Sequence, residues 1–497
     1  MSGPRVSKSC GNCRAVKRRC DKQRPQCGQC SRLREECPGY RDQWDLVFRD
    51  QTNQTIQRSQ CQAASTVITH SPLSPPPPQP SLCPSMDQVG VNAFLHHFVT
   101  GDHSPSRGYL NYIPATLGAN DDQPTLVASL AAVGLVTLAN SHRQPELVRQ
   151  ARIKYAEAIR SVNAALASPV ESVKDSTLMA VISLGVFEHF SGFDAWVRHV
   201  QGAAALTVLR GKGQFARGNP TALLLFTQVR TDIIAACTRT NRPFPPDMRA
   251  LQDEAAKHVS APNAIWEIGV LATRCVDLLW QVMESTGTTQ LPNLLDAALV
   301  LERDFELAMA TLAVQEPFYT TTAEEAGWVG GNPDAIYNGR VDFYLTPWAI
   351  RAWNNARSIQ MIVCEIICYL LKKMLTLNPA APAAQLRLRR QQLHETLGIL
   401  SRVGEDILAT VPQALGIVAP PSNPSQPYAG DVSPRASVSG AYILIWCLYM
   451  VGKSPATAEP ARKWIIRHFR KIFQGAGMEM ALPLLEEIIR IDHRRRE

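Results

Sequence analysis

The stretch CGNCRAVKRRCDKQRPQCGQCSRLREEC, residues 10–37, places six cysteines and many basic side chains in one short segment. The cysteines are Cys10, Cys13, Cys20, Cys27, Cys30 and Cys37, with the spacing C-x2-C-x6-C-x6-C-x2-C-x6-C. Two half-motifs of identical spacing therefore follow one another. Cysteine thiolates ligate zinc, which prefers four ligands in a tetrahedron. One zinc ion would leave two thiolates unused, whereas two zinc ions are both fully ligated if two of the thiolates bridge them.

The local sequence of this segment favours two short helices around a turn. The residues RAVKRR between Cys13 and Cys20 include good helix formers and no Gly or Pro. The residues SRLREE after Cys30 begin with Ser31, which is a suitable N-cap. Pro25 lies between the halves and favours a turn. Because the segment is too short to bury a hydrophobic core, we expect it to be unfolded without metal.

The excess positive charge of the chain lies almost entirely on this segment. Residues 1–40 contain ten basic and three acidic side chains, out of 51 basic and 43 acidic side chains in the whole chain. The segment therefore carries an excess of seven, while the formal net charge of the whole chain is +8. A compact basic patch of this kind indicates a polyanionic partner.

Thirteen cysteines would allow disulfides in a secreted protein, so the expected compartment matters. The N-terminal residues MSGPRVSKSCGN contain no apolar core of a signal peptide. The longest apolar run, Thr125 to Asn140, is shorter than a membrane span requires, and we expect no membrane partner. We therefore predict an intracellular protein with reduced thiols, which favours metal ligation over a disulfide scaffold.

The cysteine segment resembles the DNA-binding domain of the fungal binuclear zinc cluster transcription factors. All the cysteine spacings fit that family, and so do Arg14 and the KRR run before Cys20. The resemblance implies two zinc ions per cluster, with Cys10 and Cys27 as the bridging ligands. It also implies double-stranded DNA containing CGG triplets as a partner, a nuclear protein, and contact with the machinery of RNA polymerase II transcription.

The same resemblance assigns roles to the basic side chains of the segment. Lys17 falls on the main base-reading lysine of the family, and Arg18 lies beside it. Lysine and arginine donate to guanine O6 and N7 in the major groove, which suits this role, although a phosphate contact would explain Arg18 equally well. Four further side chains are predicted to contact phosphate, namely Arg14, Arg19, Lys22 and Arg24.

One departure from the family pattern follows the cysteines. Many members continue into a coiled coil that spaces two half-sites, but RDQWDLVFRDQTNQTIQRSQ contains a single apolar island and no sustained heptad repeat. The spacing of half-sites, and monomeric or dimeric binding, are therefore left open.

Composition divides the chain into four parts. We predict a disordered N-terminus over residues 1–9, a zinc cluster over 10–40, a disordered linker rich in Gln, Ser and Pro over 41–90, and an all-α domain over 91–497. Residues 419–436 are expected to form a flexible loop within that domain. The fold class is thus a small two-zinc module with two short helices, followed by a large all-α regulatory domain.

Helical periodicity and apolar runs dominate the large domain, and strand alternation is not convincing anywhere. The predicted helices cover residues 145–166, 176–190, 194–209, 264–285, 292–315, 348–376, 383–410, 437–452 and 460–475. Two stretches, YAEAIRSVNAAL and WVRHVQGAAAL, resemble the fungal-specific regulatory domain that accompanies zinc clusters. That resemblance implies dimerisation, inhibition or an effector response, with a homodimer through the helical domain as one partner state.

Other chemistry receives little support from the sequence. Nucleophile, metalloprotease, P-loop and dinucleotide motifs were not found, so we predict no enzyme. Cys364 and Cys368 would share a helical face as a redox pair or a metal site, but their apolar neighbours favour inert core thiols. His96 and His97 are adjacent and would point about 100° apart on a helix. The basic stretch RKWIIRHFRKIF is interpreted as a solvated helix face.

Two classes of function remain. The first is a sequence-specific DNA-binding regulator of RNA polymerase II promoters, for which the resemblance suggests a secondary-metabolite gene cluster as the target. The second is an effector-sensing or protein-interaction scaffold whose zinc module has little affinity for DNA. Lys17 and its basic neighbours favour the first class. Activation and repression are not distinguished.

Overall fold

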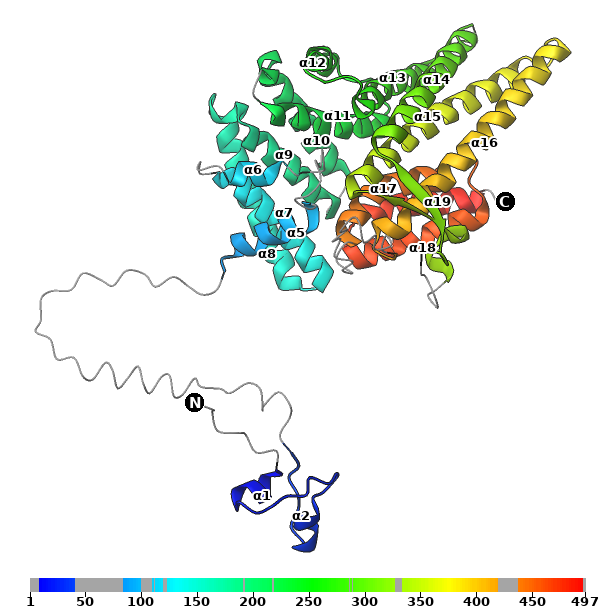
Figure 1. Ribbon diagram of the computed structural model, residues 1–497. Coiled ribbons are helices and arrows are strands. Elements are labelled where there is room, and N and C mark those ends of the chain that lie inside the picture. Colours follow the sequence, from blue (N-terminus) through cyan, green and yellow to red (C-terminus); the bar gives the residue numbers. More distant parts are fainter. Residues whose placement is uncertain are drawn as a thin grey trace, which may run out of the picture. The chain divides into compact units, whose positions relative to one another are not determined.

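The computed structural model describes two compact units, which divide the chain at Leu82 and Cys83. The described residues are 9–40, 84–99, 110, 112–118, 123–190, 193–216, 219–285, 287, 289–326, 333–418 and 437–494. Residues 1–8 of the predicted disordered N-terminus, most of the predicted linker and the predicted loop over 419–436 lie outside these residues. Figure 1 shows the helices of both units.

The first unit contains the two short helices that the sequence predicts, but both begin earlier than expected. These helices are α1 (Gly11–Ala15) and α2 (Gly28–Arg32). The Sγ atoms of Cys10 and Cys27 accept hydrogen bonds from the backbone N–H groups of Cys13 and Cys30, at 3.5 and 3.4 Å. Cysteines are therefore the N-caps, and Ser31, which was predicted to cap the second helix, lies inside it. The sequence prediction missed this because thiols are not usual capping groups.

The described part of the second unit begins with five α-helices. These helices are α5 (Met86–Phe98), the short α6 (Ile113–Leu117), α7 (Pro124–His142), α8 (Pro145–Leu166) and α9 (Asp175–Phe187), and α7 and α9 carry most of their buried residues. α5 begins inside the range predicted as linker, because Ser85 and Gln88 form a reciprocal capping box. α9 is buried along its whole length, as its apolar sequence predicts.

Within the described part of the chain, α7 is the one helix long and apolar enough to cross a membrane. It has 19 residues, its most apolar window of 18 residues has a mean hydropathy of 1.5, and it extends beyond the apolar run considered above. However, 61% of its apolar window is buried, and α5, α8 and α9 pack against it. Length and composition alone do not distinguish a membrane span from a core helix, and this burial is that of a core helix.

Close packing of α5 on α7 depends on two glycines. A Cβ atom on Gly134 would lie 1.7 Å from the carbonyl oxygen of Gly90, and a Cβ on Gly90 would lie 2.4 Å from the carbonyl oxygen of Ala131. No side chain fits at these distances, so the two backbones can meet only where both residues are glycine. Asp87 of α5 also forms an ion pair with Lys154 of α8, at 2.9 Å.

Most of the remaining helices of the second unit agree closely with the predicted ranges. They are α10 (Phe193–Leu209), α13 (Ala264–Glu284), α14 (Leu291–Gln315), α15 (Pro347–Leu377), α16 (Ala383–Ala414), α17 (Ser437–Lys453) and α18 (Glu459–Ala476). The helices α11 (Pro220–Thr240), α12 (Pro246–Ala256) and α19 (Ala481–Arg494) were not predicted. Short 3-10 turns lie between some helices of this unit, at Glu171–Val173, Glu188–Phe190, Lys212–Phe215, Pro333–Ala335 and Tyr337–Gly339. The long helices α15 and α16 pack side by side (Figure 1). The prediction of a predominantly helical domain is confirmed.

One small sheet was not predicted. Strands β1 (Phe318–Thr322) and β2 (Arg340–Tyr344) pair antiparallel, with Phe318 opposite Tyr344 and Thr322 opposite Arg340. Polar and apolar residues do alternate in β2 from Arg340 to Phe343, but the strand has only five residues, and four consecutive ones are buried. The short run and the long connection between the strands, without a tight hairpin turn, explain the omission.

The two stretches that resemble the fungal regulatory domain meet at a buried polar cluster. Tyr155 from the first stretch donates a hydrogen bond to Glu188, and its hydroxyl lies 2.9 Å from Nε2 of His199 in the second stretch. Nε2 of His199 lies 3.6 Å from the Glu188 carboxylate, which is 5% exposed. The stretches that resemble the regulatory domain therefore contain Tyr155 and His199, which connect α8 and α10 to the turn after α9.

The buried thiols agree with prediction, whereas a buried arginine does not. Cys364 and Cys368 are 0% and 2% exposed within α15, and burial raises the pKa of both thiols. They are inert core residues, as predicted. The stretch predicted as a solvated face forms most of α18, where Arg462 is 2% exposed and donates to three backbone carbonyls. The helix itself was predicted over residues 460–475, and the prediction missed only that Arg462 lies on its buried face.

Candidate metal centre and nucleic-acid interface

The six cysteine sulfurs of the first unit form two groups of four. One group contains Cys10, Cys13, Cys20 and Cys27, the other contains Cys10, Cys27, Cys30 and Cys37, and within each group all sulfurs lie within 4.8 Å of one another. Cys10 and Cys27 belong to both groups. Two tetrahedral metal sites that share two ligands require this arrangement.

The sulfur separations fit zinc. Sγ of Cys10 lies 3.5 Å from Sγ of Cys27 and 3.8 Å from Sγ of Cys30, and Sγ of Cys13 lies 3.7 Å from that of Cys27. Two thiolates on one tetrahedral zinc, each about 2.3 Å from the metal, are separated by about 3.8 Å. All the described cysteines are free thiols, and no disulfide competes for these sulfurs. Zinc bound here cross-links α1 and α2 to the segments that carry Cys20 and Cys37.

Hydrogen bonds favour the thiolate form of Cys20 and Cys37, the last cysteine of each half. The backbone N–H of Cys10 lowers the pKa of the Cys20 thiol to about 7. The backbone N–H of Cys27 likewise lowers the pKa of the Cys37 thiol. Thiolates are the form that binds metal, so the backbone favours ligation at both outer positions.

The unit consists of two halves, which begin at Cys10 and at Cys27. Residues at the same distance from these two cysteines make the same backbone contacts. The N–H of Arg18 donates to the Cys13 carbonyl at 2.9 Å, and the N–H of Glu35 donates to the Cys30 carbonyl at 3.0 Å. Lys17 and Arg34, just past the two helix ends, adopt left-handed φ angles of 52° and 54°. The repeated cysteine spacing thus becomes a repeated fold.

The side chains at the equivalent positions 18 and 35 bind each other. The Arg18 guanidinium forms an ion pair with Glu35 and also donates to Sγ of Cys13 at 3.4 Å and of Cys30 at 3.7 Å. This guanidinium holds the pKa of the Glu35 carboxyl below its ordinary value. Sequence reasoning missed this pair, because the two residues are far apart along the chain and only the repeated fold makes them equivalent.

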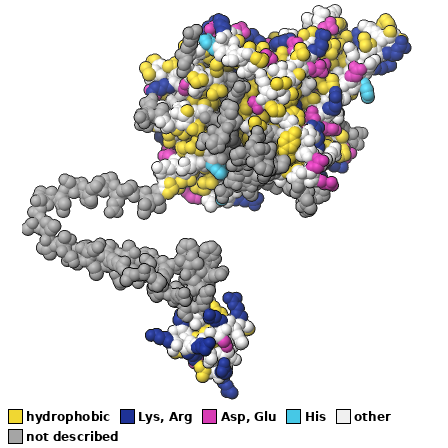
Figure 2. Space-filling view, viewed as in Figure 1, with side chains coloured by type: hydrophobic (Ala, Val, Ile, Leu, Met, Phe, Trp, Pro, Cys, Tyr) yellow, Lys and Arg dark blue, Asp and Glu magenta, His cyan; other side chains and the backbone are white. Residues whose placement is uncertain are grey.

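Most of the predicted DNA-contacting side chains are free to meet a ligand. Lys17, Arg19 and Lys22 are exposed, and their side chains form no hydrogen bond or ion pair within the described part of the unit. Arg24 is exposed and lies over the Tyr40 ring at 5.9 Å, while Arg14 is half-buried and donates to the Ser9 carbonyl at 3.1 Å. Figure 2 shows Lys and Arg side chains projecting from the unit with little acidic surface in that view. The base contact predicted for Arg18 stays a prediction, since its guanidinium faces the sulfurs and Glu35 here.

Asp21 is a further structural residue of the unit. Both of its carboxylate oxygens accept from the backbone N–H of Gly28, at 3.0 and 2.9 Å. A Cβ atom at Gly28 would lie 2.4 Å from this carboxylate. The contact fixes the beginning of α2 against the segment after Cys20, and therefore holds the two halves together.

Comparison with known families agrees with this geometry. A six-cysteine, two-metal module followed by a helical domain defines a class of DNA-binding regulators. Residues 8–45 match the model of the fungal Zn(2)-Cys(6) binuclear cluster domain, and residues 91–257 match that of the fungal specific transcription factor domain. Both resemblances drawn from the sequence are confirmed, and the cluster binds two zinc ions. Both matched families are transcription-factor domains, and the pair supports a role in transcription. No curated protein and no solved structure matches the chain.

Proposed function

We propose that the protein is a sequence-specific transcription factor of the nucleus that acts on RNA polymerase II promoters. The observation that carries this proposal is the group of exposed, unpaired basic side chains next to a six-cysteine zinc centre. The partners are double-stranded DNA and the transcription machinery. The family resemblance further suggests the genes of a secondary-metabolite cluster as targets.

In this proposal Lys17 reads the bases. It follows α1 in a left-handed conformation and is exposed, so its ammonium group is available to donate to guanine O6 and N7 of a CGG triplet. Arg14, Arg19, Lys22 and Arg24 contact phosphates and set the register of the module on DNA. Sequence preference and salt dependence would therefore come from different side chains.

Zinc holds the reading side chains in place. Cys10 and Cys27 are the bridging ligands in this proposal, because they belong to both groups of sulfurs. The other four cysteines each serve one metal. Since zinc cross-links replace a hydrophobic core in a unit of this size, removal of zinc should disperse the basic side chains and abolish sequence-specific binding.

The test is selection of a randomised duplex library by the full-length protein, at near-physiological salt, with zinc and with a chelator. Zinc-dependent enrichment of CGG-containing duplexes is expected, and the Lys17→Ala protein is the matched control. A single recovered triplet would indicate monomeric binding, and paired triplets would indicate the homodimer that the helical domain was expected to form. A folded, zinc-loaded protein that enriches no sequence would contradict the proposal and favour the scaffold or effector-sensing alternative.

A further inference from the structure

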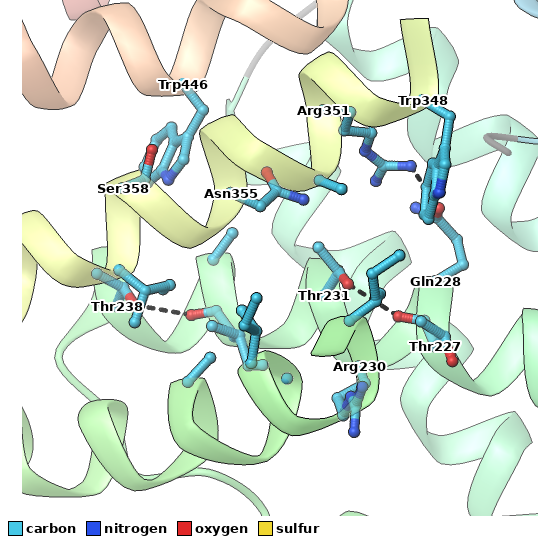
Figure 3. A pocket seen from close by; sticks show the side chains of 18 of the residues that line it. Thr227, Gln228, Arg230, Thr231, Thr238, Trp348, Arg351, Asn355, Ser358 and Trp446 are labelled. Carbon is cyan, nitrogen blue, oxygen red and sulfur yellow. Dashed lines mark hydrogen bonds between the residues drawn. The ribbon is translucent and has the colours of Figure 1, made fainter. Parts of the chain in front are cut away.

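A cavity lies inside the helical unit between α11, α13 and α15. Its volume is about 110 Å³, and most of its wall is apolar. Figure 3 shows Thr227, Thr231 and Thr238 on one side, with Trp348 and Ser358 of α15 facing them and Trp446 of α17 closing one end. This volume is smaller than the roughly 150 Å³ of an enclosed cavity that holds benzene, but the cavity is partly open, so a compact ring can extend into its mouth and a short chain can lie inside it.

Several polar atoms on this wall have no hydrogen-bond partner among the described residues. They are Oη of Tyr112, Nε of Arg230, Nε1 of Trp348 and Oγ of Ser358. An indole N–H and a guanidinium N–H can only donate. A buried donor without an acceptor costs about 1–3 kcal/mol, and four such atoms around one cavity indicate an acceptor that the chain does not supply.

Arg230 is the least satisfied of three deeply buried arginines. Arg357 donates to the Tyr344 hydroxyl and the Asp406 carbonyl, and Arg462 donates to three carbonyls. Arg230 is 1% exposed, and among the described residues its one hydrogen bond is to Oε1 of Gln252 at 3.3 Å. A guanidinium is rarely buried without an anion or several acceptors.

The surroundings of Arg230 hold its guanidinium in place without neutralising it. It lies over the Trp266 ring at 4.2 Å and against Gly269, where a Cβ atom would approach its Nη2 to 2.1 Å. It forms no ion pair with a carboxylate in the described part of the chain. Burial lowers the pKa of Arg230 to about 9, which still leaves it cationic near pH 7.

A second cation on the wall does have partners. Arg351 donates to Oε1 of Gln228 at 3.0 Å, and Gln228 donates to Asp232 at 2.8 Å. Asp232 itself lines the adjoining cavity and not this one. The uncompensated charge of the wall is therefore that of Arg230.

We propose that this cavity binds a small organic anion, with an apolar ring or short chain in the cavity and a carboxylate that accepts from Arg230. The donors of Trp348 and Tyr112 offer further contacts to acceptor atoms on the ligand. This site goes beyond the DNA-binding role of the zinc module. Its wall joins α11, within the matched regulatory domain, to α13, α15 and α17 outside the match, so a ligand would bind both parts together.

The test uses full-length, zinc-loaded protein without DNA and two fluorinated probes followed by 19F NMR. The anionic probe is 4-fluorobenzoate, and its neutral counterpart of similar shape is 4-fluorobenzamide. Saturable binding of the benzoate, at least tenfold tighter than that of the amide, is expected. Arg230→Met should weaken benzoate binding at least tenfold and leave amide binding unchanged, whereas Arg357→Met, at a buried arginine outside the cavity, should leave benzoate binding unchanged.

Two milder variants keep the proposal testable if Arg230→Met does not fold. Tyr112→Phe and Trp348→Phe each remove one donor and retain an aromatic ring, and a threefold or larger loss of benzoate affinity in at least one of them is expected. Equal affinity for the two probes, no saturable benzoate binding by the folded protein, or benzoate affinity unchanged in all folded cavity variants would each overturn the proposal. These outcomes do not depend on DNA selection, so the two proposals can fail separately.

Discussion

Residues 10–20 and 27–37 of the zinc module share one cysteine spacing and one set of backbone contacts, yet their side chains differ. Both halves place a cysteine at the N-cap, another within the short helix and a left-handed residue just after it. Arg32 of the second half is equivalent to Ala15, but at four other equivalent positions the first half carries basic residues and the second carries mostly acidic or neutral ones. The pairs are Arg14 and Ser31, Lys17 and Arg34, Arg18 and Glu35, and Arg19 and Glu36.

This difference separates metal binding from DNA binding. Metal geometry depends on the backbone and the cysteines, which the halves share, so both halves can ligate zinc equally. Recognition of DNA depends on charge, which the halves do not share. The module is therefore symmetric for zinc and asymmetric for DNA, and substitutions at equivalent positions can test each property alone.

The largest effect is expected from removal of a ligand that both halves use. Cys27→Ala leaves each group with three sulfurs, whereas Cys20→Ala leaves the group of Cys10, Cys27, Cys30 and Cys37 intact. We expect Cys27→Ala to lose both zinc ions and Cys20→Ala to retain about one, since four thiolates still surround one site. Native mass spectrometry of the full-length proteins measures the stoichiometry. Equal zinc content in the two variants would show that Cys27 is not shared.

The next effect compares the equivalent positions Lys17 and Arg34. Lys17→Ala should weaken binding to a CGG duplex by about 1–3 kcal/mol while binding to random DNA changes less, because a base contact is lost. Arg34→Ala should change binding to both duplexes by less than threefold, although both residues are exposed and share a backbone conformation. Fluorescence anisotropy with the two duplexes measures the difference. A similar loss of CGG preference in Arg34→Ala would place the second half on the bases.

A smaller effect is expected from the pair that joins the halves. Arg18→Gln and Glu35→Gln should each speed the transfer of zinc to a chelator, and the double variant should be no faster than the Arg18 variant. The pair is partly exposed, so its coupling free energy should not exceed about 1 kcal/mol. Zinc release is followed with a colorimetric chelator. If Arg18→Gln instead abolishes the CGG preference and leaves zinc release unchanged, Arg18 reads a base.

The smallest effect concerns phosphate contacts. Arg19→Ala should reduce the slope of log K against log salt by about 0.9, because one phosphate contact is lost. Glu36→Ala, at the equivalent position of the second half, should leave the slope unchanged. Titrations of the CGG duplex at several salt concentrations measure both slopes. An unchanged slope for Arg19→Ala would remove it from the interface.

The metal centre could be predicted from the sequence because ligand spacing is local. Six closely spaced cysteines leave few ways to complete two tetrahedra, and the structure groups them accordingly. Helices such as α8, whose apolar residues recur on one face, were also predictable with their ends. In both cases the residues that decide the structure are close together in the chain.

What the sequence did not reveal depends on contacts between distant residues. β2 is buried by packing, and Gln413 of α16 satisfies both backbone groups of its Tyr344. The burial of Arg230, and with it the charged wall of the cavity, depends on Trp266 and Gln252 from two other helices. Composition predicts exposure for arginine, so only the assembled fold identifies these exceptions.

The close approach of Gly90 in α5 and Gly134 in α7 determines how the helical domain would respond to a pulling force on its N-terminal end. α5 is the first helix after the segment that joins the zinc module to this domain, so tension along the chain enters at Met86. Within its first two turns the helix is fastened by backbone contact with α7 and by the Asp87–Lys154 ion pair. Because α7 lies in the core, a pull from a DNA-bound module would be carried by the whole domain instead of peeling away its first helix.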